Sequence, residues 1–282
     1  MAENLTSFKY YTGNKGIYSL KSGIAYFASP HQLNDSLEAK FELAGATHYN
    51  DALAKALNEL ARTRSQENYA FDMAGYEEFE RIHKRENERF QDACQKIGIF
   101  STSRRYDNQA MWAYYCNDLK GVCFEFEWSS EVMNKYQLVP TDVQYSNQTR
   151  IHNRAIILGD LLLEAGLQNP DWTIKELQEF SLSKEFLTSY GVLSVACATS
   201  TKHTDWQHEN ELRIISAHAG ELPIMRDILK RVFFTGTDFQ EWGTIMTLLQ
   251  QQYPNVEIAQ LIFDHKEPLV KIVPMEYRLI PA

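Results

Sequence analysis

Apolar and polar positions along the chain predict short β-strands separated by helices at irregular intervals. Residues 8–11 and 23–28 are rich in aromatic side chains and end at turn-forming residues, so both are predicted as strands. Residues 121–127 alternate in polarity, which is typical of a strand with two different faces. Further strands are predicted over residues 97–103, 137–145, 191–198, 209–216, 231–235, 256–263 and 269–273.

Helices are predicted where apolar residues recur three or four positions apart. These segments are residues 52–60, 76–95, 109–116, 149–165, 173–190 and 238–252.

The order of these elements predicts the fold class. Strands come first, then helical blocks, then strands again, without regular βαβ alternation, which favours an α+β fold with a mixed or mostly antiparallel sheet. No Pro-, Gly- or Ser-rich linker divides the chain. We therefore predict a single domain over residues 1–282, with helical insertions at about 48–96 and 149–190.

Composition excludes several classes of protein. The chain has 282 residues and a net charge of −9, which disfavours coating of nucleic acid by bulk electrostatics. The four cysteines form no CxxC pair, so we expect buried free thiols in a reducing cytosol. The first residues lack a signal-peptide pattern, and no stretch reaches the ~18 apolar residues of a membrane span. These features predict a cytoplasmic protein.

The segment around Glu209, Glu211 and Arg213 carries the strongest chemical signal. In a strand, a period of two places these three side chains on one face, with Leu212 and Ile214 toward a core. Neighbouring carboxylates suit the stabilisation of a cationic sugar transition state or the removal of a proton. A solvated strand face with a local ion pair explains the same pattern.

A second candidate site follows the predicted strand that ends at Ser103. The hydroxyls of Ser101 and Ser103 could bind a ribose, and Arg104 and Arg105 could bind a diphosphate. A strand end and its turn would also account for these residues.

Aromatic and polar side chains supply weaker candidates. Trp112 and Tyr115 lie three positions apart on a predicted helix and could stack on a base or nicotinamide, or simply belong to the core. Asn34 could cap a helix or bind a ligand. Lys9 and Tyr10, at the end of the first strand, are weaker still.

Known phosphate-loop, dinucleotide, hydrolase and zinc-protease motifs are absent from the sequence. Of eight histidines, only His203 and His208 lie near each other and near the two glutamates. Exposed loop histidines are the simpler interpretation, and no metal site is predicted.

Several of these segments together resemble the bacterial family DUF2971. The resemblance rests on the segments 8–10, 23–30, 33–38, 100–101, 111–115, 120–126 and 206–213, and it spans about residues 8–275.

The order of a strand-one aromatic, a Ser-Thr-Ser strand and a Glu-x-Glu strand also looks like that of ADP-ribosyltransferases. This resemblance implies a split sheet that binds NAD as substrate between two small antiparallel halves. It implies Glu211 as the catalytic carboxylate and Glu209 as the residue that orients the acceptor. The implied NAD-binding residues are Lys9, Tyr10, Asn34, Ser101, Ser103, Arg104, Arg105, Trp112, Tyr115 and Arg213.

The function expected from the resemblance is NAD-dependent ADP-ribosyl transfer to a protein or nucleic acid, as a toxin of a bacterial conflict or phage-defence system. An antitoxin or other inhibitory partner would then be expected, and no membrane. Two alternatives stay open. One is a noncatalytic nucleotide- or partner-binding module, and the other is a metal-dependent phosphodiesterase or nuclease using Asp35, Glu38, His208, Glu209 and Glu211.

Overall fold

The computed structural model describes residues 4–35, 42–43, 55, 58–60, 62, 88–147, 151–152, 154–181, 183–236, 240–263 and 269–272. The chain divides into two compact units. The first comprises Met1–Asn34, Lys96–Tyr145 and Lys202–Ala282, and the second comprises Asp35–Gln95 and Ser146–Thr201. The second unit thus contains most of the two segments for which we predicted helical insertions.

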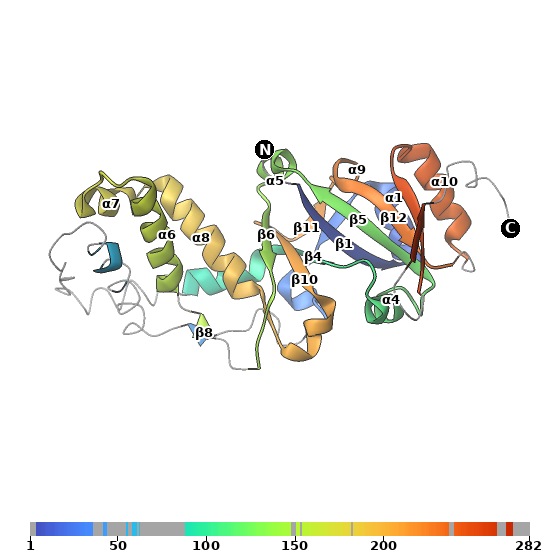
Figure 1. The fold of residues 1–282 in the computed structure, drawn as a ribbon, viewed down its shortest axis with the longest axis horizontal. Coiled ribbons are helices and arrows are strands. Elements are labelled where there is room, and N and C mark those ends of the chain that lie inside the picture. The colour runs from blue at the N-terminus through green and yellow to red at the C-terminus, as the bar shows by residue number, and fades with distance from the viewer. Residues whose placement is uncertain are drawn as a thin grey trace. The chain divides into compact units, whose positions relative to one another are not determined.

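An eight-stranded sheet forms the centre of the first unit (Figure 1). Its strand order is β14-β13-β12-β5-β1-β4-β10-β6, and among these strands every pairing is antiparallel except the parallel pair β12–β13. The strands are β1 (Leu5–Thr12), β4 (Gly98–Ser103), β5 (Gly121–Trp128), β6 (Val139–Asp142), β10 (Glu211–Ser216), β12 (Leu229–Phe234), β13 (Glu257–Ile262) and β14 (Leu269–Ile272). The predicted α+β class with a mostly antiparallel sheet is confirmed. The split sheet is not, because the three strands that carry the motifs lie within one sheet.

Alternation along β5 explains how the sheet buries both faces. Val122, Phe124, Phe126 and Trp128 belong to the main core, whereas Cys123 belongs to a second cluster on the other face. The main core is covered by helices α1 (Gly13–Ser22) and α10 (Trp242–Gln252). The second cluster lies under helix α4 (Gln109–Tyr115).

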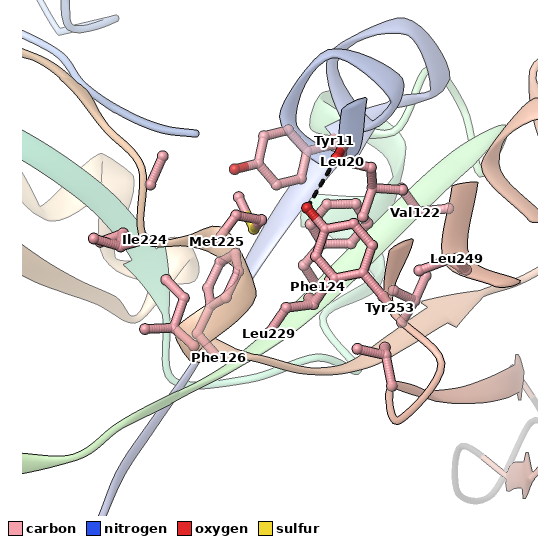
Figure 2. Packing of buried hydrophobic residues seen from close by; sticks show 14 of the residues in the cluster. Tyr11, Leu20, Val122, Phe124, Phe126, Ile224, Met225, Leu229, Leu249 and Tyr253 are labelled. Atoms are coloured by element: carbon pink, nitrogen blue, oxygen red, sulfur yellow. Dashed lines mark hydrogen bonds between the residues drawn. The ribbon is translucent and has the colours of Figure 1, made fainter. Parts of the chain in front are cut away.

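Figure 2 shows part of the main core, in which α1 meets the end of α10. Leu20 and Leu249 are fully buried there, and the Tyr253 hydroxyl donates a 2.8 Å hydrogen bond to the Leu20 carbonyl. This bond satisfies a polar group inside the core and links the two helices.

Helix α1 was not predicted, because its sequence is rich in glycine and polar residues. Gly16 allows close packing, since a Cβ at that position would lie 3.0 Å from Val122. The helix ends at Gly23, whose φ of 71° suits glycine. Packing against the sheet therefore outweighs the low helix propensity. Helix α5 (Ser130–Tyr136) was also not predicted.

Three helices dominate the described part of the second unit: α6 (Arg154–Gln168), α7 (Ile174–Ser181) and α8 (Lys184–Thr199). Residues 88–96 are also helical, and the short strands β3 (Glu42–Leu43) and β8 (Ile151–His152) pair in parallel. The predicted helices at 52–60 and 76–95 lie mostly outside the described residues.

The predicted strand over 191–198 is wrong, because α8 runs through it. Phe186, Tyr190, Ser194 and Ala198 are buried at intervals of four, which is a helical period. A short apolar run does not by itself distinguish a buried strand from a buried helix.

Shorter elements complete the described residues. They are β2 (Ala25–Phe27), β7 (Gln144–Tyr145), β9 (Thr201–Lys202), β11 (Gly220–Leu222), α9 (Met225–Ile228) and the 3-10 helices η1 (Pro30–Gln32) and η2 (Thr204–Glu209). All four cysteines are free, as predicted. Three of them are buried, but the prediction of a buried thiol is wrong for Cys197, which is exposed on α8. Among the described helices, none combines the length and the apolar character that a membrane crossing requires.

Candidate active site

The three strands that carry the predicted motifs are neighbours in the sheet. Strand β4 lies between β1 and β10, and Glu211 pairs with Ser103 while Arg213 pairs with Ser101. Since Leu212 and Ile214 enter the main core, Glu211 and Arg213 point to the opposite face, as predicted.

A buried lysine joins the two glutamates. Lys202 Nζ lies 2.6 Å from Glu209 Oε2 and 3.2 Å from Glu211 Oε2. Arg213 Nε lies 2.9 Å from Glu211 Oε1. All four residues are at most 5% exposed. We call Lys202, Glu209, Glu211 and Arg213 the buried charge cluster.

The charges around Glu211 keep its carboxylate ionised. Burial alone would raise its pKa, but Arg213 and Lys202, with hydrogen bonds from Arg213 and Ser101, lower it to about 2. The carboxylate therefore stays negative across the physiological range.

Glu209 reaches the cluster from a different backbone conformation than we predicted. It ends η2 and does not belong to β10, so the predicted strand over 209–216 begins two residues too early. Asn210 between them is left-handed, with φ of 44°, and this turn lets both carboxylates contact Lys202.

Tyr115 and Asn34 extend the cluster. The Tyr115 hydroxyl donates a 2.5 Å hydrogen bond to Glu209 Oε1 and accepts one of 2.6 Å from Asn34 Nδ2. Burial and the neighbouring carboxylates raise the pKa of Tyr115, so its hydroxyl stays protonated as a donor. Of these two residues that the sequence suggested as ligand contacts, Tyr115 thus bonds to Glu209 directly, and Asn34 bonds to Tyr115.

Two serines of β4 form hydrogen bonds to the glutamates of the buried charge cluster. Ser103 Oγ donates a 2.7 Å bond to the Glu209 carbonyl and accepts one from the Arg105 amide. Ser101 hydrogen-bonds to the Glu211 carboxylate.

Arg104 and Arg105 turn outward. Arg104 forms a two-pronged ion pair with Asp142, and Arg105 forms one with Asp107. Both guanidiniums are partly exposed and lie in the turn that follows Ser103.

Lys9, Tyr10 and Trp112 pack in the two core clusters and are not members of the buried charge cluster. The Lys9 ammonium packs 4.4 Å from the Phe100 ring centroid, in the core on the other face, and donates to the Ser101 carbonyl. Trp112 is fully buried, and Tyr10 meets its ring edge-on in the second core cluster.

Lys202 is missing from the residues that the sequence analysis suggested. It follows a long apolar run and belongs to no recognised motif, so its only sequence signal is its place seven residues before Glu209. Within the described part of the chain, no group of three or more His, Cys, Asp or Glu side chains is arranged to hold a metal ion. Glu38, named in the metal-dependent alternative, lies outside that part.

Comparison with protein families gives one match. Residues 111–214 match the model of a family described as a protein of unknown function, DUF2971. This stretch includes Tyr115, Lys202, Glu209 and Glu211, and it covers part of the range over which we expected the resemblance. No curated protein and no solved structure matches the chain.

Proposed function

We propose that this protein transfers ADP-ribose from NAD to an acceptor, with Glu211 as the catalytic carboxylate. The observation that carries the proposal is the buried, ionised carboxylate of Glu211 beside Ser101, where the β1, β4 and β10 motifs adjoin. An ionised carboxylate held in a low-dielectric site stabilises developing positive charge far better than one in water.

The proposed transfer of ADP-ribose breaks one bond and forms one. The bond between the nicotinamide nitrogen and the ribose carbon breaks, and its electron pair leaves with nicotinamide. The acceptor then forms a bond to the same carbon and loses a proton. Glu211 would stabilise the positive charge that develops on the ribose, and Arg213 would hold that carboxylate in place.

Other members of the cluster suit supporting roles. Glu209 would orient the acceptor and take its proton, with Tyr115 fixing its carboxylate. Arg104 and Arg105 would contact the diphosphate, since exposed ion pairs are weak enough to be exchanged. Lys202 would rearrange when the substrate contacts the carboxylates.

The test is nicotinamide release from NAD by the purified full chain, with and without cell lysate as a source of acceptor. We expect Glu211→Gln to lower the rate by roughly a hundredfold or more. Glu131→Gln, at an exposed glutamate of α5, is the matched control and should keep wild-type activity. Thermal melts would check that both variants fold.

Two results would overturn the proposal. One is wild-type protein that neither binds NAD by calorimetry nor releases nicotinamide. The other is full activity in a folded Glu211→Gln variant. A role as a toxin with a neutralising partner is a further proposal, and it predicts that expression of wild type, but not of Glu211→Gln, arrests growth.

A noncatalytic nucleotide-binding module is the second candidate. It is favoured by the ion pairs of Glu211, both of whose oxygens already contact cations. This candidate predicts NAD binding without nicotinamide release, so the same experiment separates the two functions.

A further inference from the structure

Three ring side chains form a row on the surface of the first unit. Tyr114 is 73% exposed, and its ring meets His208 edge-on at 6.0 Å between centroids. His208 in turn stacks on Trp206 at 6.2 Å, with an interplanar angle of 28°. We call Tyr114, His208 and Trp206 the aromatic row.

The aromatic row adjoins the buried charge cluster. The Trp206 ring centroid lies 4.7 Å from Lys202 Nζ, which contacts both glutamates. At the other end of the row, Tyr114 belongs to the same helix as Tyr115, whose hydroxyl binds Glu209. A flat ring at the Trp206 end of the row would therefore lie near Lys202, which contacts the carboxylate that is proposed to orient the acceptor.

Hydrogen bonds hold the part of the row that η2 carries, Trp206 and His208, in place. The His208 carbonyl accepts a hydrogen bond from the Asn108 side chain, and its ring lies 3.0 Å from the Asp205 carbonyl. The His203 side chain caps η2, the helix that carries Trp206 and His208. A preorganised row loses little conformational entropy when a ligand binds.

Such a row favours a nucleobase over an aliphatic side chain. Every base presents a π-face, and exposed aromatic side chains are the usual stacking platform for unpaired bases. Duplex bases are already stacked and cannot use the row.

Two guanidiniums lie near the row, although the protein is acidic as a whole. The amide of Arg104 donates to the Asn210 carbonyl, two residues after His208. The partly exposed guanidiniums of Arg104 and Arg105 are paired with Asp142 and Asp107, and a phosphate would have to displace these carboxylates. Two guanidiniums can contact one or two phosphates beside a stacked base. The net charge of −9 disfavours a longer polyanion along the surface.

We infer that the acceptor is an unpaired nucleobase of a single-stranded nucleic acid, stacked on the aromatic row beside Glu209. This inference rests on the proposed function. In the transfer step, a nitrogen or oxygen of the base bonds to the ribose carbon, the base proton passes to Glu209, and nicotinamide leaves with the electron pair.

The experiment separates transfer from nicotinamide release. Full-length protein is incubated with NAD labelled in its adenylate half and with eight-nucleotide single strands of DNA or RNA or the matching blunt duplex. We expect label on a single strand and none on the duplex. Tyr114→Ala and His208→Ala should each lower this transfer at least tenfold, while nicotinamide release without oligonucleotide stays at the wild-type rate.

Tyr18→Ala is the matched control, because Tyr18 is 52% exposed in the same unit but belongs to α1. It should transfer label like wild type. A binding measurement needs no chemistry: single strands should quench tryptophan fluorescence, and Trp206→Phe should remove that quenching. Binding should weaken only modestly with added salt, because few phosphates are contacted.

Three results would overturn the inference. They are transfer to lysate proteins without transfer to any oligonucleotide, equal transfer by Tyr114→Ala and wild type, and stronger quenching by free nucleoside monophosphates than by single strands. Absence of nicotinamide release would overturn the proposed function instead, and Trp206 quenching would then still report whether the row binds bases.

Discussion

The Tyr115 hydroxyl lies 2.5 Å from Glu209 Oε1, although the two residues are 94 positions apart. Tyr115→Phe removes this hydrogen bond but keeps the ring. Because the bond reaches a buried carboxylate, its loss should cost about 1.5–3 kcal/mol of unfolding free energy. If Glu209 orients the acceptor, transfer should fall more than nicotinamide release. Urea unfolding and the ratio of the two rates measure these effects.

Tyr18→Phe is the control for that variant. The Tyr18 hydroxyl also donates to a carboxylate, at 2.6 Å to Glu221, but both groups lie in solvent. No measurable change in stability or rate is expected there. Equal effects of the two substitutions would contradict a special role for the buried bond.

Lys202→Met should be strongly destabilising. It leaves Glu209 and Glu211 close together without the cation between them, and breaking a buried ion pair from one side typically costs about 3–5 kcal/mol. Adding Glu209→Gln should recover part of this loss, since it removes one of the two negative charges. Urea unfolding of the single and double variants measures the coupling.

Lys135→Met is the control for Lys202. The Lys135 side chain is 59% exposed and lies 3.6 Å from Asp227, so its loss should change stability little. If Lys202→Met lowered the free energy of unfolding as little as this control, the buried charge cluster would not stabilise the fold.

Stability should fall in acid through Glu211. Burial opposes its charge, but the nearby cations lower its pKa from 4.5 to about 2 in the folded protein. The stabilisation is complete above pH 4.5 and is lost as the pH falls toward 2, with a magnitude on the order of 3 kcal/mol. The free energies of unfolding of wild type and Glu211→Gln should therefore differ most at pH 7 and become similar near pH 2. Urea unfolding of both proteins at pH 7, 4.5 and 3 tests this. A difference in unfolding free energy that stays the same at all three pH values would contradict it.

Local patterns predicted most of the sheet and brought several site residues close to their observed positions. The alternation at 121–127 was sufficient to predict β5, because it depends on a period of two that a sequence displays directly. The suggestion that Ser101 and Glu211 act together came from the resemblance to ADP-ribosyltransferases.

The rest depends on tertiary contacts. Lys202 enters the cluster only because β9 and η2 bring it beside Glu209. Of the two residues wrongly predicted to begin the strand, Glu209 ends η2 and Asn210 is left-handed. Helix α1 forms despite its glycines because Gly16 packs on Val122. Neither effect has a signature in the local pattern of apolar residues.

Lys9 should make stability rise with pH in the alkaline range. Its burial lowers the pKa from 10.5 to about 8, despite the opposing attraction of Glu211. Between pH 8 and 10.5 the unfolded chain therefore binds a proton that the folded protein lacks, so folding becomes more favourable as the pH rises, by an amount on the order of 3 kcal/mol in total. Below pH 8 the lysine is charged in both states, and the burial penalty is at its largest. Buried thiols such as Cys123 have raised pKa values and act in the opposite direction in wild type and variants alike, so Lys9 is isolated by a difference. The stability of wild type relative to Lys9→Met should rise with pH, whereas its stability relative to Lys120→Met, at an exposed lysine, should not. Urea unfolding at pH 7.5 and 10 measures the difference, and an unchanged slope in Lys9→Met would show that the ammonium is not held in the core beside Phe100.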